Sequence, residues 1–452
     1  MEANLGSKDM KRRELIALMA GVAAFGFSAN AHAIDWKQQS GKEITVLLSE
    51  HPWTAELRKH VSEFESETGI KVKINAFAED LYTDRMNLAV RSSEPVADVY
   101  MVQMDSALFT QWEAGVVEPL TPYLNDPAKT DADYNLADYP EGFRAGASFP
   151  VGQPDPQLYA IPISFEAYTL FYNKDLVDKY LGGKVPATMD ALIAAANEIS
   201  AKGDGKIFGA SMRGKRSAEL VDTMTGIVLD AWGPEKADLP YNFWFDGDWS
   251  KPRFNDPRIA KGLSYYAGLL KAGPPSVLSY GWEDASRFFS QGNAAFFVDA
   301  SVFGPGFEDP KNSAVAGKVG YAPLPPSEGT IGYSGHWSWG ISIAKNSEKK
   351  DAAWLFVQWA TNKKMTALLG VATGGAPRDS SWADPAYVKA LNPGYVEAVK
   401  TQMQHTRPTS VFRQGWSDVV LLVVDAIHQI YGGTAPADAV EELQVNVQDT
   451  LN

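Results

Sequence analysis

Between residues 43 and 102 the chain alternates strand-like and helix-like segments, and this order narrows the possible folds more than any other feature. The strand-like segments are short runs of apolar and β-branched residues, and the first and last are apolar almost throughout. The first helix-like segment ends at Gly69, where glycine can adopt the left-handed conformation that closes a helix. A β-α-β-α-β order predicts a parallel sheet covered by helices. The strands are expected at residues 43–49, 70–74 and 97–102, and the helices around residues 57–64 and 84–91.

Polar and aromatic residues follow two of these strands at the point where each strand ends. Glu50, His51 and Trp53 follow the first strand, and Asp105 follows the third. In open α/β sheets, ligands bind beyond the carboxyl ends of the strands. These two loops are therefore predicted to line a ligand site.

A second α/β unit begins near residue 164, so a chain of two halves is expected. Thr188 is predicted to cap a helix that ends at Gly203, and a later strand ends in the carboxylate of Asp299. The 452 residues exceed the size of one comfortable hydrophobic core, which also favours two lobes. Further expected features are strands at residues 294–299 and 338–343, a helix from residue 347, an irregular region at residues 232–257 and helical structure over residues 417–451.

The first 33 residues have the pattern of a secretory signal peptide. A basic cluster at residues 11–13 precedes residues 15–29, which carry no charge, and Ala31-His32-Ala33 supplies small residues at the expected cleavage positions. We therefore expect export to the periplasm with cleavage after Ala33. Met10 directly precedes the basic cluster, so it competes with Met1 as the start of translation. The pattern leaves open whether the general or the twin-arginine route is used.

Composition excludes several classes of protein. The net charge is −14 and no basic stretch follows the signal, which argues against a nucleic-acid partner. The chain has no cysteine, which excludes disulfides, thiol catalysis, cysteine zinc sites and lipid attachment through a cysteine. No second apolar run has the length of a membrane span, so the exported protein is expected to be soluble. The 13 Trp, 18 Tyr and 21 Phe residues suit a core and also the stacking of rings on sugars.

Several segments, in this order and spacing, resemble the extracellular solute-binding proteins of ABC importers, specifically the carbohydrate-binding family that includes maltose-binding protein. Two of the motifs are Trp112-Glu113-Ala114-Gly115 and Tyr172-Asn173-Lys174-Asp175-Leu176. The resemblance covers essentially the whole chain after the signal. The segments that carry it are residues 64–72, 97–120, 159–176 with Pro186 and Thr188, 288–295, 335–342 with 346–359, and 374–378.

The resemblance implies a bilobal periplasmic-binding-protein fold of type II, with two parallel-core α/β lobes, a hinge and a ligand cleft between the lobes. It implies one lobe of residues 34–160 with 332–374, and another of residues 161–331 with 375–452. It also implies a monomer without a cofactor that closes around a sugar, polyol or oligosaccharide. The closed form would deliver this ligand to a membrane permease driven by an ATPase.

The resemblance also suggests candidate binding residues. Asp105 and Glu166 match positions where relatives bind sugar hydroxyls with carboxylates, which can accept hydrogen bonds from two hydroxyls at once. Asp105 alternatively caps the helix that begins near residue 106, and Glu166 alternatively forms a salt bridge between the lobes. Trp337 is the preferred stacking residue, with Trp339 as the alternative.

The remaining candidates are less specific to the family pattern. Glu50 and His51 lie in a loop that lines the cleft in relatives, and Trp53 either stacks on a sugar or holds the following helix. Asp299 ends a strand after which relatives often carry an aromatic residue, but here that aromatic is displaced to residue 303. Arg213, Arg378 and Arg413 would suit an anionic ligand such as a uronate or a sugar phosphate, or serve in surface contacts or salt bridges.

Two rival functions are open to the sequence. An exported glycosidase could use Asp105 and Glu166 as its carboxylate pair, although no catalytic motif accompanies them. A metal-binding protein of the same bilobal class would need ligand spacing that the six histidines lack. Release of product from a glycan would identify the first, and stoichiometric metal in the purified protein would identify the second.

Overall fold

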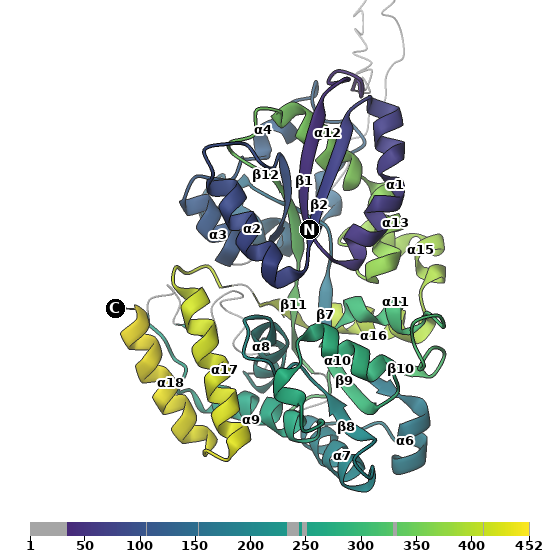
Figure 1. Cartoon of the computed structure of the whole chain (residues 1–452), viewed down its shortest axis with the longest axis vertical. Helices are drawn as coiled ribbons and strands as arrows, with labels where there is room; N and C mark the ends of the chain where they lie inside the picture. Colours follow the sequence, from purple (N-terminus) through teal and green to yellow (C-terminus); the bar gives the residue numbers. More distant parts are fainter. Residues whose placement is uncertain are drawn as a thin grey trace, which may run out of the picture.

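Two β-sheets, each covered by helices, form two lobes in this computed structural model (Figure 1). The structure describes residues 34–104, 106–151, 153–232, 244–245, 251–328, 332–409 and 411–451. The expected signal peptide, Asp105 and most of the expected irregular region at 232–257 lie outside these ranges. Among the described residues, no helix combines the length and the apolar character that crossing a membrane requires.

The first sheet has the strand order β2-β1-β3-β12-β6. Its first three strands are parallel, as the alternation of strands and helices predicts, whereas β12 runs antiparallel to both β3 and β6. The second strand is longer than expected, because its pairing with β1 continues to Phe77. The strands of this sheet are β1 (Glu43–Ser49), β2 (Lys71–Phe77), β3 (Val99–Gln103), β6 (Ile161–Pro162) and β12 (Trp339–Ile343).

The helices of the first lobe follow the local signals in the sequence. His51 is the N-cap of α1, and its Nδ1 accepts a hydrogen bond from the Trp53 N–H at 3.2 Å. Gly69 ends the same helix with a φ of 74°. The helix expected from residue 347 begins at Lys350, and the Ser347 hydroxyl before it donates to Asp98 Oδ1 at 2.7 Å. The helices here are α1 (Pro52–Thr68), α2 (Glu79–Arg91), α3 (Ser106–Glu113), α4 (Thr121–Leu124), α5 (Glu141–Gly146), α12 (Lys350–Ala360) and α13 (Lys363–Thr373).

The second sheet has the order β13-β11-β7-β9-β8, and β10 also pairs with β7. Its directions are mixed: β8 is parallel to β9, but β7 is antiparallel to β9, β10 and β11. A parallel core is therefore clearer in the first lobe than in the second. The strands are β7 (Glu166–Asn173), β8 (Phe208–Ser211), β9 (Ala294–Ala300), β10 (Val319–Ala322), β11 (Ser334–Trp337) and β13 (Thr406–Pro408), with a separate hairpin of β4 (Ser148–Phe149) and β5 (Gln157–Leu158).

The helices of the second lobe also begin and end at recognisable residues. Thr188 caps α7 as predicted, because its hydroxyl accepts from the Ala191 N–H at 3.2 Å. The expected helical region at the end of the chain is two helices, separated at Gly433, whose φ is 112°. The helices are α6 (Lys174–Leu181), α7 (Met189–Lys202), α8 (Glu219–Trp232), α9 (Pro257–Lys271), α10 (Trp282–Ser290), α11 (Gly304–Phe307), α14 (Asp379–Ala383), α15 (Pro385–Ala390), α16 (Pro393–Met403), α17 (Trp416–Gly432) and α18 (Pro436–Leu451).

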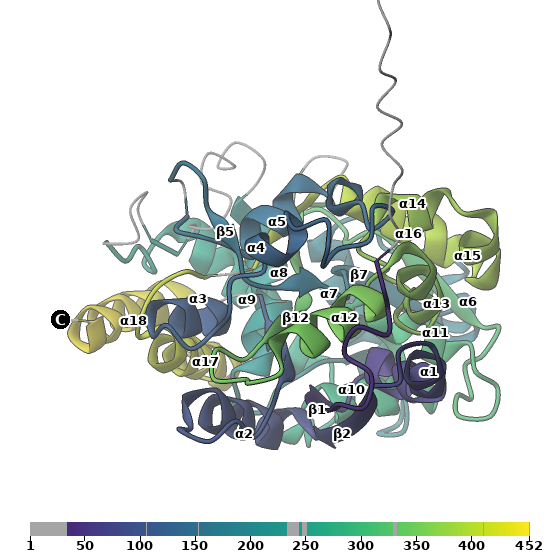
Figure 2. The same ribbon diagram turned by 90° about the horizontal axis from the view of Figure 1, so that it is seen from above.

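Two of the places where the chain crosses between the two sheets position the functional site. It leaves the first sheet between β6 and β7 and returns between β11 and β12, and β7 and β11 pair side by side between the lobes (Figure 1). The lobe boundaries expected at 160/161, 331/332 and 374/375 stay predictions. Seen from above, α17 and α18 lie at the opposite end of the molecule from α14 and α15 (Figure 2).

Candidate functional site

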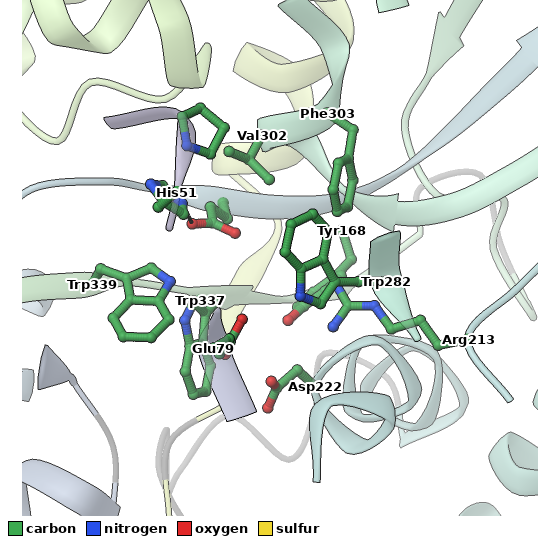
Figure 3. A pocket seen from close by; sticks show the side chains of 12 residues that line it. His51, Glu79, Tyr168, Arg213, Asp222, Trp282, Val302, Phe303, Trp337 and Trp339 are labelled. Atoms are coloured by element: carbon green, nitrogen blue, oxygen red, sulfur yellow. Dashed lines mark hydrogen bonds and ion pairs between the residues drawn. The ribbon is translucent and has the colours of Figure 1, made fainter. Parts of the chain in front are cut away.

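A cavity of about 440 Å³ lies between the two lobes, where the crossing strands bring them together (Figure 3). The first lobe contributes the start of α1, the start of α2 and the first residue of β12. The second lobe contributes β7, β11, α8, α10 and the segments after β8 and β9. The lining residues are His51, Pro52, Glu79, Glu166, Tyr168, Arg213, Asp222, Trp282, Val302, Phe303, Trp337 and Trp339.

A histidine and a glutamate connect the two lobes at this cavity. His51 Nε2 lies 3.3 Å from Glu166 Oε1, and the Ser164 hydroxyl donates to the same oxygen at 3.1 Å. Because His51 Nδ1 accepts the Trp53 N–H, a neutral His51 ring carries its proton on Nε2 and donates it to Glu166. Glu166 keeps its second carboxylate oxygen for other donors.

An arginine is held in the cavity wall by a buried carboxylate. Arg213 Nε and Nη2 donate to the two oxygens of Asp299 at 2.9 and 2.6 Å, and Nη1 donates to the Glu219 carbonyl at 2.8 Å. Asp299 is fully buried and also accepts from the Thr223 hydroxyl at 3.2 Å. Such a two-pronged pair fixes the plane of the guanidinium group. Arg213 can then present its remaining N–H groups to a ligand.

Glu79 reaches the cavity from the beginning of α2. Its Oε1 accepts from Gln103 Nε2 at 3.5 Å. Loss of hydration between the lobes, together with repulsion from Glu219 and Glu166, raises the pKa of the partly buried Glu79 carboxyl to about 7, against the opposing effect of Arg213. Glu79 is therefore divided between its neutral and charged forms near neutral pH.

Aromatic rings surround these polar groups (Figure 3). The rings of Trp337 and Trp339 meet nearly edge to face, with centroids 6.2 Å apart and planes at 77°. Trp282 and Phe303 pack against each other at 5.7 Å. Ring faces bind the C–H faces of carbohydrates and polyols, while carboxylates and a guanidinium bind their hydroxyls. The cavity is thus suited to a small ligand that carries many hydroxyl groups.

The structure brings together four of the residues that the sequence suggested. His51, Glu166, Arg213 and Trp337 all line the cavity. Trp339, the alternative to Trp337, lines it as well, so the two indole rings share the site. Asp105 lies outside the described residues, and its expected contact stays a prediction.

Five other suggested residues lie elsewhere. Glu50 forms a two-pronged pair with Arg58 at 2.8 and 2.9 Å on the exposed side of its loop. Trp53 is 1% exposed and packs in the core of the first lobe, which favours the alternative that it holds the helix over stacking on a sugar. Asp299 does not line the cavity but binds Arg213, which does. Arg413 does not line the cavity either, and its guanidinium lies 5.1 Å from the ring centre of Phe245.

Arg378 is the clearest correction, because it is fully buried away from the cavity. Its Nε and Nη2 donate to the Thr361 carbonyl at 3.0 and 2.8 Å, and Nη1 contacts Asp138 at 3.2 Å. The guanidinium also lies 4.2 Å from the ring centre of Tyr139. Its donors bind the end of α12 and residues 135–138 rather than a ligand.

Replacing Arg378 by lysine is expected to lower the free energy of unfolding by about 1–3 kcal/mol, because an ammonium group cannot reproduce the fork to Thr361. Ligand affinity of the folded variant should be unchanged. Chemical denaturation and calorimetric titration measure the two effects separately. Lost affinity in a stable variant would return Arg378 to the ligand site.

Sequence reasoning missed several lining residues. Glu79 follows β2, which ends at Phe77. Ligands bind beyond the carboxyl ends of the strands in such sheets, so a correct prediction of the end of β2 would have indicated Glu79 as a candidate. Tyr168, Asp222 and Trp282 carry no local signal, since they belong to a strand and two helices whose cavity-facing sides depend on packing. Phe303 was noted only as a displaced aromatic residue, and it occupies the cavity wall.

Among the residues that the structure describes, no group of three or more histidine, aspartate or glutamate side chains is arranged to hold a metal ion.

Comparisons with known proteins agree with this arrangement. The model of the bacterial extracellular solute-binding protein family matches residues 49–367. The erythritol/L-threitol-binding protein of Mycolicibacterium smegmatis is 26% identical over 96% of each chain. The mannitol-binding protein of Pseudomonas aeruginosa is 30% identical over 72% of this chain and 71% of that protein.

Solved structures show the same fold. A solute-binding protein from Agrobacterium vitis with bound D-mannitol has 25% identity and a TM-score of 0.75, covering 91% of this chain and 98% of the other. One from Agrobacterium radiobacter in complex with ribitol has 24% identity and a TM-score of 0.75, covering 90% and 98%. The bilobal architecture predicted from the sequence is confirmed.

Proposed function

This chain belongs to the bacterial extracellular solute-binding protein family, and on that premise we propose that it is the periplasmic substrate-binding subunit of an ABC importer for a small linear polyol. The observation that carries the proposal is the cavity between the lobes, where carboxylates, a guanidinium and aromatic rings meet. Two relatives named for erythritol/L-threitol and for mannitol support the same ligand class.

The size of the cavity favours a short ligand over an oligosaccharide. Its volume of 440 Å³ includes space open to solvent, and the room inside it for the centres of water-sized molecules is only about 40 Å³. An open-chain polyol can place alternate hydroxyls against Glu166, Asp222 and Arg213 while its carbon chain lies between the rings. A maltodextrin would need a longer groove.

Charge disfavours the alternative of an anionic ligand. Among the described lining residues, three carboxylates face one guanidinium, and Arg213 already neutralises Asp299. Arg378 and Arg413, which could have served an acid, lie outside the lining. A uronate or a sugar phosphate would therefore meet repulsion in this cavity.

The ligand would act by holding the lobes together. The contact of His51 with Glu166 joins them beside the cavity, and a polyol that touches both walls binds the closed state better than the open one. We propose that the closed form docks on a membrane permease that an ATPase drives. The role is one of capture and delivery, without catalysis, in the periplasm.

A ligand screen tests this proposal. We expect D-mannitol, ribitol or erythritol to stabilise the purified protein by about 2.7 kcal/mol when present at about 100 times its dissociation constant. Thermal unfolding in the presence of these polyols, maltotriose, D-glucuronate and a sugar phosphate measures the effect. Stabilisation by maltotriose or the acids alone would contradict the assignment to polyols.

A further inference from the structure

Glu79 is placed where charged groups of both lobes converge. β7 carries Glu166, α8 begins with Glu219 and carries Asp222, and the segment after β8 carries Arg213. On its own side, Glu79 has His51 at the start of α1 as a neighbour in the lining and Gln103 of β3 as a hydrogen-bond donor at 3.5 Å. Figure 3 shows Glu79, Arg213 and Asp222 around the same cavity.

The positive charge of Arg213 in this wall is already paired with the buried carboxylate of Asp299. Arg213 is the one arginine or lysine among the described lining residues, and two of its nitrogen atoms bind the buried carboxylate of Asp299. Within the described part of the chain, no ion pair involves Glu79. A polyol carries no charge, so its arrival displaces water from the carboxylates without supplying a counter-charge.

Protonation is the simplest way to relieve this excess of negative charge. Carboxylates that share a desolvated space do not all stay ionised, because repulsion and lost hydration both favour the neutral form of one of them. The pKa of the Glu79 carboxyl is raised to about 7 where the two lobes meet around the cavity. A neutral carboxyl can donate one hydrogen bond and accept others, as a polyol hydroxyl requires.

We propose that Glu79 binds the polyol as a neutral carboxyl group, and that closure of the lobes around the ligand takes up one proton from solvent. This inference rests on the proposed function, and it assigns Glu79 a role in ligand selection. A neutral Glu79 donates its proton to a ligand oxygen, whereas Glu166 and Asp222 accept from ligand hydroxyls. The three carboxyl groups together form hydrogen bonds with both the donor hydroxyls and the acceptor oxygens of the polyol.

The direction of the pH dependence follows from linkage. In the open form, the acids of the second lobe move away from Glu79, so its pKa returns toward the ordinary value of 4.5. In the closed form the pKa is about 7. Proton uptake therefore favours closure fully below pH 4.5, and this contribution is lost as pH rises through 7. We expect polyol affinity to be about tenfold higher at pH 6 than at pH 8.

Isothermal titration calorimetry with D-mannitol, ribitol and erythritol tests the proposal. Titrations at pH 6 and pH 8, in buffers that differ in ionisation enthalpy, count the protons taken up by the wild-type protein. We expect about one proton per polyol at pH 6 and almost none at pH 8. Binding without proton uptake at pH 6 would overturn the role of Glu79 while leaving the polyol assignment intact. Failure of all three polyols to bind would overturn the polyol assignment and this inference with it.

Glu79→Gln gives the matched variant, because glutamine resembles the neutral carboxyl group. Its affinity is expected to be the same at pH 6 and pH 8. Glu50→Gln is the control, since Glu50 pairs with Arg58 outside the cavity and this variant should keep the tenfold change. A pH dependence that persists in Glu79→Gln would assign the proton to another group, such as His51, and overturn the proposal. If the variant does not fold, binding without proton uptake by the wild-type protein at pH 6 still overturns the proposal.

Discussion

Replacing Asp299 by alanine is expected to lower the free energy of unfolding by about 3–5 kcal/mol. The change leaves the Arg213 guanidinium without its two-pronged partner in a site where Asp299 is fully buried and Arg213 is 8% exposed. It also removes the acceptor for the Thr223 hydroxyl. An unpaired buried charge costs far more than a lost surface contact. Chemical denaturation of the wild-type and variant proteins measures the difference.

The exposed pair of Glu50 and Arg58 provides the control for this experiment. Its geometry is also two-pronged, at 2.8 and 2.9 Å, but both side chains are more than one-third exposed. Solvent screens such a pair, so Glu50→Ala should cost no more than about 1 kcal/mol. Equal losses in the two variants would contradict the structural role of burial at Asp299. Polyol binding should weaken in Asp299→Ala as well, since Arg213 loses its fixed orientation.

Replacing Trp337 by alanine is expected to weaken polyol binding at least tenfold, or about 1.4 kcal/mol. The indole ring is 9% exposed and forms part of the cavity wall beside Trp339. Its removal takes away the ring face against which the carbon chain of the ligand would lie. The backbone of β11 still pairs with β7 at Glu166, so the strand itself is retained. Calorimetric titration with D-mannitol measures the loss.

Trp382→Ala is the matched control for Trp337→Ala. This partly buried tryptophan lies on α14, where its indole N–H donates to the Ala376 carbonyl at 2.9 Å, and it does not line the cavity. Its removal should leave the affinity unchanged. If Trp337→Ala binds normally while Trp339→Ala does not, the stacking role belongs to Trp339, the alternative that the sequence left open.

The parts of the fold that could be predicted are those that depend on local sequence patterns, namely apolar runs and the residues that begin or end helices. The first strand is found at residues 43–49 as expected, because a continuous apolar run bounded by polar residues has few other stable conformations. Thr188 and Gly69 bound their helices through contacts with residues only a few positions away. The predicted end of β2 was wrong because pairing with a neighbouring strand determines it, and β2 extends to Phe77 along its partner β1.

The candidate site was predictable only where a residue directly follows a strand or lies within a family motif. His51, Glu166 and Trp337 satisfied one of these conditions and line the cavity, and Arg213, which was suggested only by a cleft-facing loop of the resembling fold, lines it as well. Trp53 satisfied the first condition as well, yet its ring turns into the core of the first lobe. The position along the chain indicates a loop near the site, but packing decides which side chains of that loop face the ligand.

The sequence by itself determined the alternation of strands and helices and most helix ends, because these depend on short-range patterns. It also determined the resemblance to solute-binding proteins, because the order and spacing of the motifs are properties of the chain itself. Only the tertiary structure decided which charged side chains pair with other residues of the protein and which line the cavity. Arg213 and Asp299 are 86 positions apart, and Arg378 and Asp138 are 240 positions apart. A buried arginine looks the same in the sequence whether its partner is a carboxylate or a ligand, and the folded chain alone brings the partner within hydrogen-bonding distance.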